Sequence, residues 1–288
     1  MAANSITHLP IIKVDQSASA EISDALAIEE PLEIRLEYST DDGRQVKNIS
    51  VTMRTPGNDE ELATGFLFTE GVIKHQRDVS SVNNVFIACA ENKQNIIQVS
   101  LAEGVEPNLH NSERNFYTTS SCGVCGKGSI NAIRTVSAFT GDRDDNTIAA
   151  EVLCRLPKIL SEYQKIFADT GGLHASALFT PTGEFILLRE DVGRHNALDK
   201  LIGACMAENL LPLNKNILLL SGRTSFELVQ KAAMAGINII AAVGAPSSLA
   251  VQLAEEFNIT LIGFLRNERF NIYTAAHRIL IHEHEITH

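Results

Sequence analysis

The chain has 288 residues, of which 44% are apolar, and its formal net charge is -11. This length allows one large domain or two ordinary ones with a sizeable core. The acidic balance argues against a general nucleic-acid binder, because phosphate contacts along a nucleic acid need clustered Lys and Arg, but it leaves room for one anionic ligand in a local basic pocket.

Residues 1–30 are polar and show no sustained period, so we expect a partly mobile N-terminal arm. Apolar and polar residues then alternate strictly over 32–38, which is typical of a half-buried strand. The turn residues 41–43 lead into 46–53, which is predicted to return as the second strand of a hairpin.

A helix is predicted from Asn58, its expected N-cap, to Gly71, because three acidic residues occupy the first turn. Apolar runs at 85–89 and 96–101 predict two more strands. Together these elements predict a small α+β domain over residues 31–115.

The second half of the chain changes pattern, because almost wholly apolar strands alternate with helices. This pattern is typical of a parallel sheet covered on both faces, so we predict an α/β domain over 116–288. A hairpin is expected at 175–188, and the His- and Glu-rich tail at 279–288 is more simply a frayed terminus than a metal site. The predicted strands are 175–179, 184–188, 217–220, 237–243 and 259–264, and the predicted helices are 157–167, 195–208, 226–235 and 248–257.

Two cysteines open this domain. Cys122 and Cys125 stand three positions apart, each is followed by glycine, and Lys127 adds a positive charge. A helix is predicted from Ser129. A nearby cation and the positive end of a helix both favour the thiolate, which is the reactive form. The sequence therefore predicts a mobile loop that carries a reactive sulfur.

Several uses of a Cys-x-x-Cys pair stay open on spacing alone. Half of a zinc site would need two more ligands, and the sequence has no second paired motif at ordinary spacing. A dithiol–disulfide switch, a persulfide relay and two incidental thiols are the alternatives. The other cysteines, Cys89, Cys154 and Cys205, are most simply core residues.

The five cysteines are an odd number, and the N-terminus shows no secretory pattern, which suggests reduced thiols. No apolar run approaches the roughly 18 residues of a membrane helix. We therefore expect a cytoplasmic protein without membrane contact.

Polar groups follow strand ends, where α/β sheets usually bind ligands. His174 opens a predicted strand behind a glycine pair, and Arg194 and His195 open a helix after the charged stretch 189–191. Simpler interpretations are that His174 is a structural histidine and that Asn196 caps the helix. We favour a binding site at the second of these places.

Two later strand ends repeat this logic. Arg223 lies within 221–225, whose hydroxyls, backbone amides and guanidinium suit phosphate, although Ser225 also fits an ordinary helix cap. The stretch 264–269 suits a flat heterocycle that bears phosphates, or is a polar turn between strands. Its residues are Phe264, Leu265, Arg266, Asn267, Glu268 and Arg269.

Taken together, five motifs over about residues 30–275 resemble the FdhD family, sulfur-carrier proteins needed to make active formate dehydrogenase. The motifs are Arg54–Gly57 with Gly65–Gly71, Cys122–Gly126, Gly172–Ser176, Glu190–Lys200 and Ser221–Glu227. The resemblance implies a cytidine-deaminase-like three-layer C-terminal domain and a homodimer. It also implies sulfur transfer from a cysteine desulfurase to the molybdenum cofactor in its bis-molybdopterin guanine dinucleotide form.

In this resemblance Cys122 is the persulfide carrier, Cys125 assists it, and 264–269 contacts the cofactor. Zinc deaminases need His-x-Glu and Pro-Cys-x-x-Cys. Here His174 is not followed by Glu two positions on, and Ser121 precedes the first thiol instead of Pro. The resemblance therefore implies the fold of a deaminase without its chemistry, and no metal site.

We predict a cytoplasmic sulfurtransferase whose partners are a cysteine desulfurase and the catalytic subunit of formate dehydrogenase. The alternative is a redox-switched chaperone that binds the molybdenum cofactor without moving sulfur. The expected catalytic residues are Cys122 and Cys125, and the expected cofactor-binding residues are His174, Arg194, His195, Arg223 and Phe264 to Arg269.

Overall fold

The computed structural model describes residues 5–85, 95–109, 116–117, 139 and 146–281. The first hairpin predicted by alternation is confirmed: β3 (Glu30–Thr40) and β4 (Gly43–Arg54) pair antiparallel. Leu32, Ile34 and Leu36 are completely buried, so one face of β3 supplies the core.

Three more strands complete a five-stranded sheet in the order β5-β6-β3-β4-β7. They are β5 (Val79–Asn84), β6 (Ile96–Leu101) and the short β7 (Phe116–Tyr117). The strand predicted at 96–101 is confirmed. A strand was also predicted at 85–89. Val85 is not part of a strand, because β5 ends one residue earlier, and residues 86–89 lie outside the described residues. The sequence of β5 is mostly polar, which hid its strand character.

The helix predicted after this hairpin is α1 (Asp59–Thr69). A short 3-10 helix, η1 (Gln76–Asp78), follows it. Asn58 stands at the N-cap with a left-handed φ of 58°, but its side chain makes no capping hydrogen bond. The predicted position of the N-cap is therefore confirmed, but the predicted capping by the Asn58 side chain is wrong. The next residue, Asp59, receives two hydrogen bonds of 2.9 Å from the guanidinium of Arg54.

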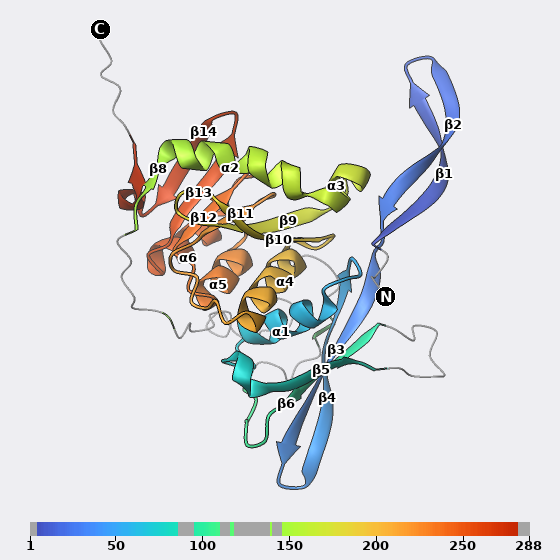
Figure 1. The fold of residues 1–288 in the computed structure, drawn as a ribbon, viewed down its shortest axis with the longest axis vertical. Coiled ribbons are helices and arrows are strands. Elements are labelled where there is room, and N and C mark those ends of the chain that lie inside the picture. Colours follow the sequence, from blue (N-terminus) through green and yellow to red (C-terminus); the bar gives the residue numbers. More distant parts are fainter. Residues whose placement is uncertain (1–4, 86–94, 110–115, 118–138, 140–145, 282–288) are drawn as a thin grey trace.

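The N-terminal arm contains regular structure that the sequence did not predict. β1 (Ile6–Asp15) and β2 (Ala18–Ala27) pair along their whole length and project from the body (Figure 1). Ile12 and Val14 are exposed, so neither face of the hairpin shows the one-sided burial that alternation reports. The N-terminal arm expected at 1–30 therefore contains a hairpin that its sequence did not predict, and its mobility stays a prediction.

The C-terminal half builds a six-stranded sheet in the order β10-β9-β11-β12-β13-β14. β11, β12 and β13 are parallel, and β9 and β10 form the predicted antiparallel hairpin, so both expectations are confirmed. β14 was not predicted. The strands are β9 (His174–Phe179), β10 (Phe185–Asp191), β11 (Ile217–Leu220), β12 (Ile239–Ala242), β13 (Thr260–Arg266) and β14 (Arg269–Thr274).

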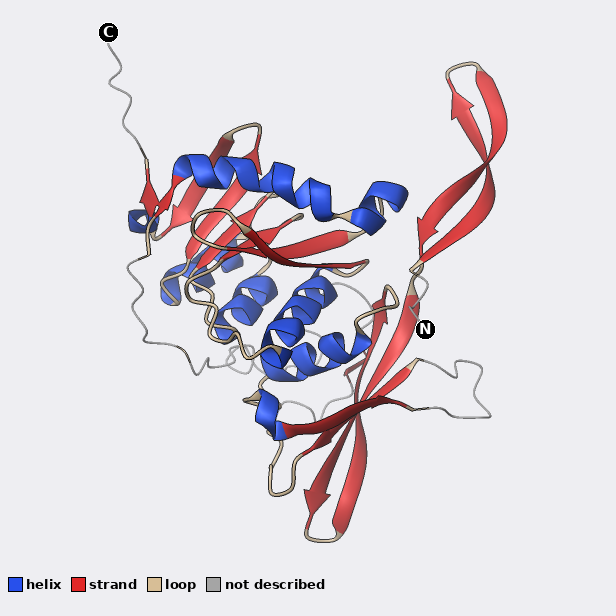
Figure 2. Ribbon diagram, in the orientation of Figure 1, coloured by secondary structure: helices blue, strands red, loops and turns tan. Residues whose placement is uncertain are grey.

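Helices cover both faces of this sheet (Figures 1 and 2). On one face lie α2 (Ala150–Tyr163) and α3 (Lys165–Thr170), and on the other lie α4, α5 and α6. The last three are α4 (Arg194–Ala207), α5 (Phe226–Met234) and α6 (Ser248–Glu256), close to their predicted bounds. The chain is thus a mixed α/β protein. No helix within the described ranges is long and apolar enough to cross a bilayer.

The structure corrects the predicted bounds of one helix and the predicted start of the C-terminal tail. The helix expected at 157–167 starts earlier, at Ala150, keeps Pro157 in its interior, and breaks at Gln164 into α2 and α3. The tail expected from 279 begins, after η3 (Ala276–Arg278), as the short strand β15 (Ile279–Leu280). It pairs in parallel with β8 (Ile148–Ala149).

The two halves share one core, because α1 packs between α4 and the five-stranded sheet (Figure 1). Glycines make this helix contact close. A Cβ on Gly65 would overlap the carbonyl oxygen of Asp199, and one on Gly203 would overlap the carbonyl oxygen of Glu61. No flexible side chain stands at either place that could move aside.

Gly203→Ala should therefore lower the free energy of unfolding by about 3 kcal/mol, because the added methyl group forces α1 and α4 apart. Urea unfolding measures this loss. Gly172→Ala is the matched control, since its nearest new contact is 3.9 Å away. Equal midpoints for the two variants would contradict the close contact.

Candidate functional site

The predicted ligand motifs lie side by side at one end of the six-stranded sheet, where β11, β12 and β13 end and β9 begins. We call this row of strand ends the edge. The amide of Phe264 donates to the carbonyl of Gly244 at 3.0 Å, and the amide of Gly244 donates to the carbonyl of Gly222 at 3.1 Å. Gly222 lies against His174, whose Nδ1 would be 3.2 Å from a Cβ at that glycine. The edge therefore runs without interruption from β13 through β12 and β11 to β9.

Positive side chains gather at the β9 end of this edge. Arg194 and His195 stand in the first turn of α4, Arg223 follows β11, and all three act electrostatically on His174. Within the part of the chain that the structure describes, Arg194 and Arg223 form no ion pair, and Nε of Arg194 is buried without a hydrogen-bond partner. The cluster of His174, Arg194, His195 and Arg223, which we call the cationic cluster, can therefore receive an anion.

Two buried hydroxyls support this assignment. Ser176 and Thr224 are each 1% exposed, and neither side-chain oxygen has a hydrogen-bond partner among the described residues. Buried polar groups are normally satisfied, so orphaned hydroxyls near a charged cluster indicate a place for a bound group or water. Ser176 lies two residues after His174 and so on the same face of β9, which the period of a strand could have shown.

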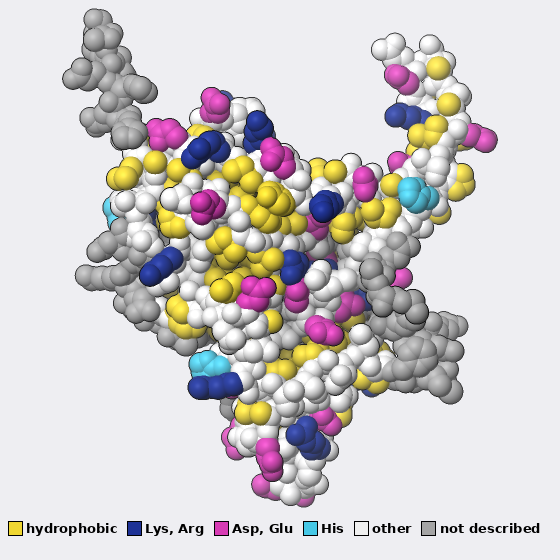
Figure 3. All heavy atoms as spheres, viewed as in Figure 1, with side chains coloured by type: hydrophobic (Ala, Val, Ile, Leu, Met, Phe, Trp, Pro, Cys, Tyr) yellow, Lys and Arg dark blue, Asp and Glu magenta, His cyan; other side chains and the backbone are white. Residues whose placement is uncertain are grey.

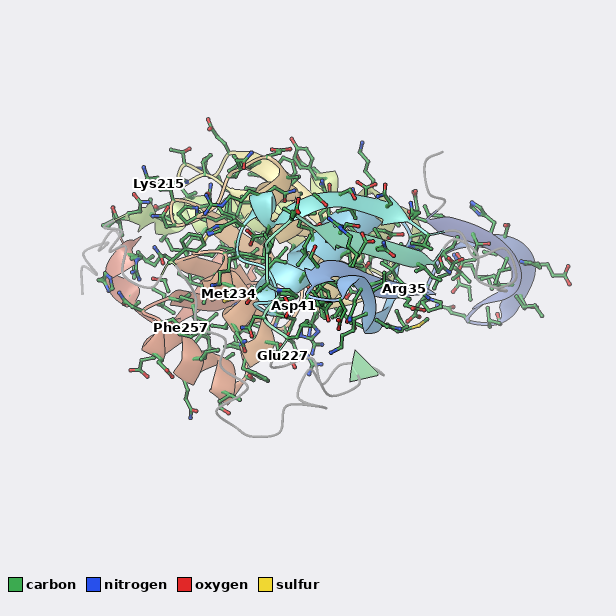
Figure 4. The ribbon with its side chains drawn as sticks, turned by 90° about the horizontal axis from the view of Figure 1, so that it is seen from below. Arg35, Asp41, Lys215, Glu227, Met234 and Phe257 are labelled. Carbon is green, nitrogen blue, oxygen red and sulfur yellow. The ribbon has the colours of Figure 1, made fainter. Side chains whose placement is uncertain are left out.

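His195 is held by a carboxylate. Its Nε2 lies 2.8 Å from Oε2 of Glu227, labelled in Figure 4, which comes from the first turn of α5. The same nitrogen lies 3.2 Å from Oγ of Ser225. A hydrolase relay uses both ring nitrogens, one toward the nucleophile and one toward the acid. Because Glu227 and Ser225 share one ring nitrogen here, Ser225 is not arranged as a hydrolytic nucleophile. The geometry suits His195 as a positioned cation or hydrogen-bond donor.

His174 is held in its neutral form. Burial lowers its pKa, and the charges of Arg194, His195 and Arg223 lower it further, while Asp191 opposes them weakly. A neutral imidazole at the centre of permanent cations can accept a proton when an anion arrives.

Part of the charged motif at 190–200 proves structural. Asp191 is completely buried and lies 2.7 Å from Nζ of Lys200, which also donates to the carbonyl of Thr55 at 2.8 Å. Nδ2 of Asn196 donates to the carbonyl of Met53 at 2.7 Å, and α4 starts from Gly193 as N-cap. The interpretation of Asn196 as the helix cap is therefore wrong, because its amide binds β4.

The stretch 264–269 forms the other end of the edge. Leu265 is buried in the core beneath α2, so only its backbone borders the edge, while Arg266 to Arg269 are exposed. Arg266 stands 6.0 Å from the ring centre of Phe264. Asn267 and Glu268 both have positive φ, as a two-residue hairpin turn requires. The alternative interpretation of this stretch as a polar turn between strands is therefore confirmed, although the turn lacks the usual Asn-Gly and the bounds of β14 were not predicted.

The surroundings of both described cysteines disfavour the thiolate. Burial raises the pKa of Cys154, and Glu268 and Glu151 raise it further. Burial raises the pKa of Cys205 to about 12. The predicted reactive pair, Cys122 and Cys125, and Lys127 and the helix expected from Ser129 lie outside the described residues, so their place at this edge stays a prediction.

The described residues that flank this pair bear on its reach. Tyr117 pairs with Val51 on β4, two residues before Met53, whose carbonyl receives Asn196. Four residues lie between Tyr117 and the first thiol, and the five Cα–Cα steps from Tyr117 to Cys122 span at most about 17 Å. The start of the thiol segment is therefore tied to the strand that supports the first turn of α4.

No group of three or more His, Cys, Asp or Glu side chains in the described ranges is placed to hold a metal ion. Fold and site define a mixed α/β protein whose six-stranded sheet carries the cationic cluster at the ends of its strands.

Comparison with known proteins gives the family. A model of the FdhD/NarQ family matches residues 27–280. The sulfur carrier protein FdhD of Mycolicibacterium paratuberculosis is 52% identical over 259 residues, which cover 89% of this chain and 92% of the relative. The protein of the same name from Streptomyces coelicolor is 48% identical over 276 residues, 94% of each chain.

A crystal structure described as a formate dehydrogenase accessory protein from Desulfotalea psychrophila has the same fold. It matches with a TM-score of 0.71 and 25% identity, and the match covers 96% of this chain and 100% of that chain. The chain belongs to the FdhD/NarQ family, which confirms the resemblance seen in its motifs.

The buried pair of Asp191 and Lys200 gives a stability prediction. Lys200→Met should lower the free energy of unfolding by about 3–5 kcal/mol, because it leaves a buried carboxylate without its counter-charge. The double variant Asp191→Asn/Lys200→Met should recover much of this loss in the same denaturation assay.

The matched control is Arg44→Met, which breaks the exposed pair with Glu37 and should cost below about 1 kcal/mol. If Lys200→Met costs no more than Arg44→Met, the ion pair does not hold β4 to the site.

Proposed function

We propose that this chain is a sulfur carrier that serves formate dehydrogenase. It accepts sulfane sulfur from a cysteine desulfurase on Cys122 and delivers it to the molybdenum cofactor, bis-molybdopterin guanine dinucleotide, before that cofactor enters the catalytic subunit. The observation that carries this proposal is the cationic cluster, whose arginines have no anionic partner among the described residues, in a chain whose relatives are named sulfur carriers.

The loading step needs only a nucleophilic thiolate. The thiolate of Cys122 attacks the terminal sulfur of the desulfurase persulfide, a new S–S bond forms, and the cysteine of the desulfurase leaves as thiolate. Delivery as a sulfide ligand needs two electrons. The thiolate of Cys125 supplies them by attacking Sγ of Cys122, which releases sulfide and leaves a Cys122–Cys125 disulfide.

The substrate cofactor carries diphosphate groups and guanines, and the residues along the edge fit both. Arg194 and Arg223 suit the diphosphate as permanent cations that are free to bind it, and the orphaned hydroxyl of Thr224 can donate to it. Phe264 and Arg266 suit the flat guanine ring. The β13 end of the proposed site also includes Asn267, Glu268 and Arg269. The β9 end also includes His174 and His195.

Three further proposals follow from the family. The helix–sheet–helix half is cytidine-deaminase-like in arrangement, the protein works as a homodimer, and it works in the cytoplasm, where thiols stay reduced. Apolar side chains exposed on hairpin β1–β2, such as Leu9, Ile12 and Val14, offer surface that association would cover (Figure 3).

The second candidate is a redox-switched chaperone that binds the cofactor and moves no sulfur. The same cationic cluster would serve it, with a Cys122–Cys125 disulfide as its switch. A thiol–disulfide oxidoreductase is disfavoured, because the sequence lacks a thioredoxin-like setting for the pair.

Mass spectrometry after incubation with a desulfurase and cysteine separates these functions. A carrier gains one sulfur on Cys122, whereas a redox switch loses two hydrogens. Cys122→Ala should abolish loading and leave cofactor binding unchanged. Cys154→Ala, which removes a thiol of raised pKa, is the control and should load normally. Full loading of the Cys122 variant would refute the carrier role.

Binding of the diphosphate tests the cationic cluster separately. Arg223→Gln should weaken binding of diguanosine diphosphate at least tenfold, because a charge-assisted hydrogen bond is worth about 1.5–3 kcal/mol. Isothermal titration calorimetry measures this change. Arg77→Gln, in η1 away from the edge, is the control. Equal affinities of both variants would place the ligand elsewhere.

A further inference from the structure

His174 has an unusual position within the cationic cluster. It is half-buried, stands at the start of β9, and makes no hydrogen bond with any described residue. The glycine that faces it, Gly222, leaves its Nδ1 uncovered by a side chain. A ring that has no protein partner but lies among cations is placed to interact with whatever anion those cations bind.

We propose that His174 is the proton-accepting residue of the anion site: it takes up one proton when a diphosphate binds, so that substrate binding is coupled to pH. This inference rests on the proposed function, since it takes the diphosphate of the cofactor as the bound anion. The proton comes from solvent, and no bond other than N–H forms.

The groups that face His174 come from three elements. Arg194 and His195 face it from α4, Arg223 faces it from the loop after β11, and Asp191 faces it from the end of β10. The single carboxylate among them is engaged by Nζ of Lys200 at 2.7 Å. Without a ligand, positive charge therefore dominates, and burial adds to its effect, so the pKa of His174 lies below its ordinary 6.5.

A bound diphosphate reverses this balance. Its two negative charges offset Arg194 and Arg223, and the imidazolium can then donate a hydrogen bond to a phosphate oxygen. The pKa of His174 is thus low in the free protein and raised in the complex. Between these two values binding takes up a proton, and affinity falls about tenfold for each unit that the pH rises. Below the lower value, affinity no longer depends on pH.

His195, unlike His174, already has protein partners. Its Nε2 is 2.8 Å from the carboxylate of Glu227 and 3.2 Å from Ser225. His174 has no carboxylate contact of this kind among the described residues. The two histidines can therefore be separated by substitution.

The test uses diguanosine diphosphate, whose diester phosphates do not titrate near neutral pH. Calorimetry in two buffers of different ionisation enthalpy counts the protons taken up, from about pH 6 to about pH 8.5. Wild type should take up close to one proton over part of this range. His174→Gln should bind with an affinity that does not change with pH, and His8→Gln, in the projecting hairpin, should behave as wild type.

A measurement on the unchanged protein guards against a folding defect in the variant. The ring-proton NMR signal of His174 should titrate at a higher pH once the ligand is bound. No uptake by wild type, or equal uptake by His174→Gln, overturns the inference while the anion site stands. No binding by wild type at any pH overturns the proposed function together with the inference.

Discussion

One buried carboxylate sets the geometry of the site. Asp191 is fully desolvated, and a charge in that position must be matched by donors. It receives Nζ of Lys200 at 2.7 Å and the backbone amides of Gly193 at 2.8 Å and Thr55 at 3.1 Å. These donors come from α4, the turn before it, and Thr55, the residue that follows β4. Satisfying one charge therefore fixes where α4 begins, and with it where Arg194 stands.

The site consequently depends on a part of the chain that contributes no described site residue. α1 holds α4 through the glycine contact of Gly65 and Gly203, and Oγ1 of Thr69 donates to Asp199 of α4 at 2.8 Å. Asp199 also pairs with Lys231 of α5 at 3.0 Å. The N-terminal sheet thus acts as a support for the helix whose first turn carries the cations, and the two halves share one core.

Sequence patterns revealed what local periodicity controls and missed what distant partners control. The strands at 96–101 and 217–220 were predictable because their burial follows their own residues. The hairpin β1–β2 was not, because its pairing needs no buried face. The strand-end rule brought Arg194, His195 and Arg223 to one edge correctly. It could not show that Asn196 binds Met53, a partner 143 residues away, or that Thr224 keeps an orphaned hydroxyl.

The cationic cluster would also allow an acidic chain to hold the acidic substrate proposed above. With a net charge of -11 the surface as a whole repels anions, so attraction has to be local and partly desolvated to matter. Arg194 and Arg223 lack ion-pair partners among the described residues. An anion bound there, as proposed above, would gain the hydrogen bonds of Arg194 and Thr224. Of the nearby carboxylates, Asp191 is engaged by Lys200, outside the cluster, and Glu227 contacts His195, a member of the cluster, rather than either arginine.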